Sequence, residues 1–115
     1  MTYNTALIDE MLNTQFKDRL RSEGFMFDEV GASFHGYPTQ FEGLDAELRP
    51  YSFRLRSNRA TFIRGNIWNN MFEMYDRPTV YINVKVPEGT TAEEAFFALV
   101  LQAEREGGEV NVELV

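Results

Sequence analysis

The stretch from Thr79 to Val115 constrains the fold more than any other part of the chain. Residues 79–86 alternate between apolar and polar side chains, which is typical of a half-buried strand. A turn that contains proline and glycine follows, and an apolar run from Ala92 to Ala103 then predicts a helix. Two glycines end this helix, and alternation returns over the last residues. We therefore predict a β-α-β unit, in which the helix returns the chain to a neighbouring parallel strand.

The start of this predicted helix carries its own signal. Thr90 and Thr91 are each followed three residues later by a glutamate, Glu93 and Glu94. In a capping box, a threonine oxygen and a glutamate side chain satisfy backbone N–H groups that the first helical turn leaves without partners. Both threonines are candidates for this role.

A second helix is predicted near the N-terminus. Asn4 or Thr5 can cap it, and Gly24 is a suitable stop. Apolar residues recur between them at spacings of three and four, which forms one face of a helix. We expect this stripe to pack on a sheet, and it consists of Ile8, Met11, Leu12, Phe16 and Leu20.

The first half of the region between the two helices is rich in turn residues. We interpret Phe25–Val30 as a first strand. Residues 31–48 contain three glycines and a proline, and we interpret them as a hairpin with irregular ends. A loop region of this length in a small domain is often functional.

The second half of this region alternates more clearly. Tyr51–Arg56 and Thr61–Trp68 predict two antiparallel strands, joined by a tight turn centred on Asn58-Arg59. Asn69–Asp76 fits either a short helix or a continued strand, and the sequence leaves both open.

These elements predict one domain, residues 1–115, of the α+β class. We expect a two-layer sandwich in which a mixed, mostly antiparallel sheet packs two main helices on one face, with the β-α-β unit at the C-terminus. Alternation predicts which side chains lie on the other face of the sheet. These are Arg54, Arg56, Tyr81, Asn83, Lys85, Asn111 and Glu113.

Composition narrows the possible functions. The chain has no cysteine and a single histidine, His35, so disulfides, thiol catalysis and ordinary zinc sites are not expected. It contains neither a glycine-rich phosphate-binding loop nor a Gly-x-Ser-x-Gly motif. We predict a protein that is not an enzyme and that binds no cofactor and no metal. Without a spanning apolar run or a signal-peptide pattern, we expect it in the cytoplasm and not in a membrane.

Charge is the most informative feature of the composition. The net charge is −7, yet residues 50–78 hold five basic and two acidic side chains. Five arginines fall in the stretch from Arg49 to Arg64 without an intervening acid, and the aromatic residues Tyr51, Phe53, Phe62 and Trp68 are interleaved along the same region. These arginines can pair with the protein's own carboxylates, contact a protein or ligand, or bind single-stranded nucleic acid. The overall negative charge disfavours nucleic acid.

Small size, acidity and the lack of catalytic motifs resemble, in general character, the small accessory proteins that phages and mobile elements encode. Many of those proteins bind and inhibit a host protein. The leading hypothesis is therefore a non-catalytic protein-binding module, and such an inhibitor is the specific form that we consider. A self-assembling structural subunit (a homo-oligomer) and a binder of small anions or nucleic acid are the alternatives. The candidate partner-binding residues are Arg54, Arg56, Arg59, Arg64, His35, Tyr37 and Phe41.

Overall fold

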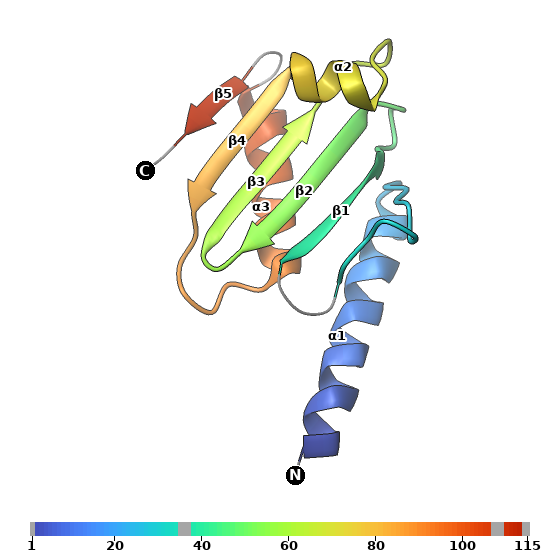
Figure 1. Cartoon of the computed structure of the whole chain (residues 1–115), viewed down its shortest axis with the longest axis vertical. Helices are drawn as coiled ribbons and strands as arrows, with labels where there is room; N and C mark the ends of the chain where they lie inside the picture. The colour runs from blue at the N-terminus through green and yellow to red at the C-terminus, as the bar shows by residue number, and fades with distance from the viewer. Residues whose placement is uncertain (1, 35–37, 107–109, 114–115) are drawn as a thin grey trace.

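A computed structural model describes residues 2–34, 38–106 and 110–113 of the chain. Figure 1 shows how its three helices and five strands are arranged. In chain order the elements are α1 (Thr2–Ser22), β1 (Thr39–Leu44), β2 (Pro50–Arg56), β3 (Arg59–Arg64), α2 (Met71–Asp76), β4 (Val80–Lys85), α3 (Ala92–Glu106) and β5 (Val110–Glu113). Within the described residues, no helix combines the length and the apolar character needed to cross a membrane.

The five strands form one sheet in the order β1-β2-β3-β4-β5. The first three neighbouring pairs are antiparallel, and β4 pairs with β5 in parallel. Helix α3 connects these two parallel strands and lies behind the sheet in Figure 1. The predicted α+β class, the mixed sheet and the C-terminal β-α-β unit are therefore confirmed.

The capping box at the start of α3 uses the second of the two threonines. The backbone N–H of Glu94 donates to the hydroxyl of Thr91 at 3.1 Å, and the N–H of Thr91 donates to the Glu94 carboxylate at 3.3 Å. The Thr90 hydroxyl instead donates to the Pro87 carbonyl at 2.6 Å, which holds the preceding turn. The helix start thus follows from local sequence alone.

The core lies between the sheet and the helices α3 and α1, and it is built largely of aromatic rings. Phe96 of α3 is fully buried at its centre. Its ring lies 5.3 Å from that of Phe53, 5.9 Å from that of Phe62 and 6.0 Å from that of Phe16, measured between centroids. The rings of Phe53 and Phe62 meet that of Phe96 edge to face, an arrangement that is favourable beyond its burial of apolar area.

The predicted apolar stripe of α1 is only half correct. Phe16 and Leu20 are buried against the sheet, but Met11 is 61% exposed and Leu12 is 51% exposed. Figure 1 shows the reason, because the first half of α1 extends past the edge of the sheet and has no layer beneath it. The structure does not describe the side chain of Ile8.

The prediction of a first strand at Phe25–Val30 is wrong. This segment runs along the outer edge of β1, where Met26 N–H donates to the Leu44 carbonyl at 2.8 Å and Asp28 N–H to the Glu42 carbonyl at 3.0 Å. The Asp28 carboxylate then accepts from the N–H of Val30 at 3.0 Å, which turns the chain away before a full ladder forms.

The hairpin between β2 and β3 also differs from the prediction. Its turn is Ser57-Asn58, with Ser57 at φ = 57°. Arg56 therefore pairs with Arg59, whereas the turn predicted at Asn58-Arg59 would pair Arg56 with Thr61, two residues further along β3. Positive φ is what a two-residue hairpin turn requires. A displacement by two residues keeps every side chain on its predicted face, because the side-chain period of a strand is also two.

The structure decides the open question at Asn69–Asp76 in favour of a helix. Asn70 accepts a hydrogen bond from the Glu73 N–H at 2.9 Å, and the Glu73 carboxylate accepts one from the Asn70 N–H at 3.2 Å. This capping box starts α2, and the side chain of Met74 is fully buried beneath it. Consequently β3 ends at Arg64, four residues earlier than predicted.

Candidate functional site

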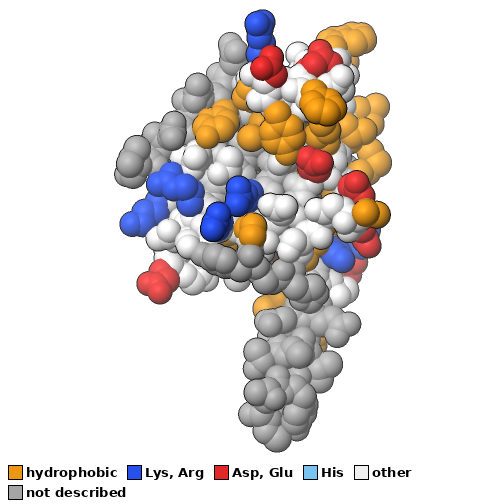
Figure 2. Space-filling model, in the orientation of Figure 1, with side chains coloured by type: hydrophobic (Ala, Val, Ile, Leu, Met, Phe, Trp, Pro, Cys, Tyr) orange, Lys and Arg blue, Asp and Glu red, His pale blue; other side chains and the backbone are white. Residues whose placement is uncertain are grey.

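The face of the sheet opposite α3, which we call the open face, is largely polar. Figure 2 views the molecule from this side. The alternation predicted from sequence places Ser52, Thr61 and Asn83 there, while their strand neighbours Phe53, Phe62 and Ile82 are buried in the core. Helix α2 covers one end of this face (Figure 1).

Basic residues meet on the open face at the end away from α2. The strand register places Arg56, Arg59 and Lys85 side by side on β2, β3 and β4. Arg54 lies two residues before Arg56 on the same strand and therefore on the same face. We call these four residues the basic row, and Figure 2 shows Lys and Arg side chains gathered on this face.

Most of the basic row is not neutralised by the protein's own acids. Arg54, Arg56 and Lys85 are exposed, and none of the described carboxylates forms an ion pair with them. Arg59 is half-buried and donates from Nη1 to the side-chain oxygen of Asn83 at 3.0 Å. That hydrogen bond holds one guanidinium in place while the adjacent cations remain available to solvent.

The other two arginines of the sequence cluster have a structural role. Arg64 is buried on the core face, and its Nη1 lies 2.9 Å from a carboxylate oxygen of Glu104 on α3. Arg49 contacts the same oxygen at 3.3 Å and also pairs with the buried Asp45 at 2.8 Å. Arg64 is two residues from Phe62, so the period of the strand already places both on the core face.

Phe41, another predicted contact residue, does not extend this surface. Phe41 is 3% exposed, and its ring stacks on that of Phe34 with centroids 4.9 Å apart. A side chain so deep in the core has no area to offer a partner. His35 and Tyr37 lie outside the described residues.

A groove of about 360 Å³ on the open face extends from one member of the basic row to α2. Tyr75 of α2 lines one part of it and Arg54 another, with Thr61 and Ile63 among the other lining residues. The Tyr75 hydroxyl lies 2.8 Å from both the Ser52 hydroxyl and a Glu42 carboxylate oxygen.

The same tyrosine is held in its protonated form. Burial raises the pKa of the Tyr75 hydroxyl, the Ser52 hydrogen bond opposes this effect, and the Glu42 carboxylate adds to it. The neutral hydroxyl can therefore donate to Glu42 and accept from Ser52, which fixes α2 over the end of the groove.

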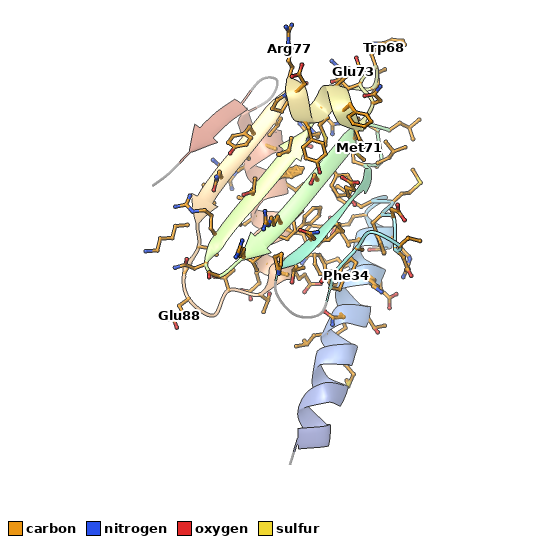
Figure 3. The ribbon with its side chains drawn as sticks, viewed as in Figure 1. Phe34, Trp68, Met71, Glu73, Arg77 and Glu88 are labelled. Carbon is orange, nitrogen blue, oxygen red and sulfur yellow. The ribbon has the colours of Figure 1, made fainter. Side chains whose placement is uncertain are left out.

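Sequence reasoning missed a group of apolar side chains beside this groove. Trp68 is 83% exposed and Phe72 is 87% exposed, and Ile67 and Tyr75 are each about half exposed. Figure 3 shows Trp68 pointing away from the sheet at the end that α2 occupies. We call Ile67, Trp68, Phe72 and Tyr75 the aromatic crest. Its sequence signal was weak, since apolar residues near a short helix are more often part of the core.

Among the described residues, no three acidic or histidine side chains come together in a way that could hold a metal ion. Comparison with protein-family models, with curated protein sequences and with solved structures finds no match. The functional interpretation therefore depends on the chemistry of the open face and the crest.

Proposed function

We propose that this protein is a non-catalytic binding module whose open face docks on an acidic surface of another protein. The observation that carries the proposal is the exposed group Arg54, Arg56 and Lys85, which no described carboxylate neutralises in a chain of net charge −7. A guanidinium presents a planar fork of N–H donors that suits a carboxylate, so such a group favours an acidic partner.

We further propose that this binding inhibits a host protein and takes place in the cytoplasm. An inhibitor acts by covering a surface of its target, and this requires contact residues of suitable charge and no reacting groups. The lack of cysteine in the sequence supports a cytoplasmic setting, because the chain has no disulfide to form elsewhere.

The test is an affinity pull-down from nuclease-treated host lysate with the Arg54→Glu, Arg56→Glu double variant beside the wild type. We expect the wild type to retain one protein in stoichiometric amount, and titration with that purified protein to show more than tenfold weaker binding by the variant. Arg105→Glu, an exposed arginine on α3, controls for charge reversal as such. Unchanged affinity in the double variant contradicts the choice of surface.

Self-assembly is the second candidate, and the position of β5 favours it. β5 is the last strand in the sheet order, so its outer edge can pair with a strand of another copy. A homo-oligomer whose mass stays constant across dilution, measured by light scattering, supports this candidate, and a monomer contradicts it.

Binding of a small anion or of nucleic acid is the third candidate, because phosphates also suit the basic row. Nuclease treatment in the pull-down removes nucleic-acid bridges. An affinity for single-stranded oligonucleotides that falls steeply with salt supports this candidate, since phosphate contacts release counterions.

A further inference from the structure

The packing of the fold does not require the exposed side chains of Trp68 and Phe72 in the aromatic crest. Phe72 and Trp68 are among the most exposed large apolar side chains described, while Met74 of the same helix is fully buried and attaches α2 to the sheet. Large apolar groups in water are unfavourable, and grouped ones mark interaction sites more often than isolated ones do. The crest therefore calls for an explanation outside the packing of this chain.

The turn that presents Trp68 is held by its own asparagines. The Asn66 side-chain oxygen accepts from the Trp68 N–H at 2.9 Å, and the Asn69 side-chain oxygen accepts from the Asn66 N–H at 2.9 Å. A backbone hydrogen bond of 3.1 Å from Asn69 N–H to the Asn66 carbonyl closes the same turn. At Gly65 a Cβ atom would lie 2.8 Å from the Asn69 oxygen, so a glycine leaves room for this network.

Helix α2 fixes the direction of Phe72 in the same way. The reciprocal hydrogen bonds of Asn70 and Glu73 set where the helix begins. Because Met74 points into the core and Tyr75 is hydrogen-bonded to Ser52, Phe72 is left on the solvent side of the helix. The backbone that carries the crest is thus pre-organised, and only its side chains remain to be ordered on binding.

We propose that the aromatic crest is the apolar half of the partner-binding surface, and that the partner presents an apolar pocket bordered by carboxylates. This inference depends on the function proposed above. The crest fills the pocket and the basic row meets the carboxylates, since the groove that Tyr75 and Arg54 both line joins the two. Tryptophan, tyrosine and arginine are the residues that most often dominate binding energy at protein interfaces.

The charges near the crest favour a protein over a membrane or a second copy. Glu73 and Asp76 are exposed on the same short helix as Phe72, and they would repel an anionic lipid surface. The net charge of −7 also opposes the approach of a second copy, although the basic row is a local exception.

The test uses Trp68, the sole tryptophan of the sequence, as its reporter. A random peptide library displayed on phage is selected in parallel against the wild type and against Phe72→Ala, and the most enriched wild-type peptide is synthesised. We expect enriched peptides to combine aromatic or aliphatic residues with Asp or Glu. Titration of the peptide should shift Trp68 emission to shorter wavelength and protect it from acrylamide, and Phe72→Ala should weaken binding at least tenfold.

A control variant, Leu101→Ala, removes an exposed apolar side chain on α3 and should leave peptide binding unchanged. The Arg54→Glu, Arg56→Glu variant and Phe72→Ala together separate this inference from the function on which it depends. If the Arg54→Glu, Arg56→Glu variant loses binding while Phe72→Ala binds normally, the crest is not part of the surface, although the basic row is. If neither variant changes binding, both the inference and the proposed function are wrong.

Further outcomes also overturn the inference. Equal enrichment on wild type and Phe72→Ala, or no enrichment, shows that the crest selects no partner. Enriched peptides that lack acidic residues contradict the proposal that carboxylates border the partner's apolar pocket. An emission shift with protein concentration alone, accompanied by dimerisation in light scattering, identifies a second copy as the occupant. An equal shift with phosphatidylserine vesicles identifies a lipid surface.

Discussion

The same substitution at two phenylalanines should have very different consequences for stability. Phe96 is fully buried at the centre of the aromatic core, whereas Phe72 is 87% exposed on α2. We therefore expect Phe96→Ala to destabilise the protein strongly and Phe72→Ala to leave its free energy of unfolding nearly unchanged. The comparison tests whether Phe72 of the crest is free of any role in the fold.

The magnitude follows from burial and from the cavity left behind. Transfer of a buried phenylalanine side chain from water contributes about 1.5–3 kcal/mol. Most of the rings around Phe96 belong to other parts of the chain and cannot collapse fully into the space, so the cavity raises the total to about 3–5 kcal/mol. An exposed substitution away from special features changes stability by less than about 0.5 kcal/mol.

Urea unfolding followed by circular dichroism measures both effects. With an m-value of about 1.5 kcal/mol/M, the Phe96→Ala midpoint should fall by roughly 2–3 M, and the Phe72→Ala midpoint by less than about 0.3 M. If Phe96→Ala does not fold in water, Phe96→Leu leaves a smaller cavity and should show a smaller loss in the same direction. A loss above about 1.5 kcal/mol in Phe72→Ala would refute the interpretation that the crest is exposed for a partner.

Three further predictions concern the core face. Burial raises the pKa of the Tyr51 hydroxyl far above its ordinary value of 10.0, so the folded state keeps a proton that the unfolded state releases, and stability should fall as the pH rises above 10. In Tyr51→Phe this fall, measured by urea unfolding from pH 8 to pH 11, should be smaller; equal slopes contradict the assignment. A Cβ at Gly43 would clash with the Met26 carbonyl, so Gly43→Ala should cost about 2 kcal/mol in thermal unfolding, while Gly31→Ala, with nothing within 4 Å, should cost little. Arg64→Met replaces a buried member of an ion pair with an apolar side chain of similar volume, so it should change the free energy of unfolding by less than about 1.5 kcal/mol and leave partner affinity unchanged. A tenfold loss of affinity would show that Arg64 is part of the binding surface.

The candidate site could be predicted from the sequence only in part. The alternation of β2 placed Arg54 and Arg56 on the open face correctly, because side chains in a strand alternate whatever its neighbours are. Arg64 was grouped with them by proximity in sequence, although its strand period assigns it to the face of Phe62. Lys85 was expected on the open face, but its place beside Arg56 and Arg59 depends on two strand registers.

The sequence by itself determined the elements whose signals are local. The capping box of α3 joins residues three positions apart, and the periodicity of β4 and α3 specifies the β-α-β unit within one continuous stretch. Such features depend on backbone hydrogen bonding and on which face of an element is apolar. Both the hydrogen bonding and the apolar face are set by residues that are close together in the sequence.

Only the tertiary structure determined which apolar faces are covered by another layer of the fold. The first half of α1 extends past the sheet, and Phe25–Val30 follows the edge of β1 without joining it as a strand. Tertiary structure also placed Met74 inward and Phe72 outward, and it brought Tyr75 of the crest to the same groove as Arg54. Periodicity shows that a face is apolar, but burial depends on contacts between residues distant in sequence, and those contacts exist only once the sheet has formed.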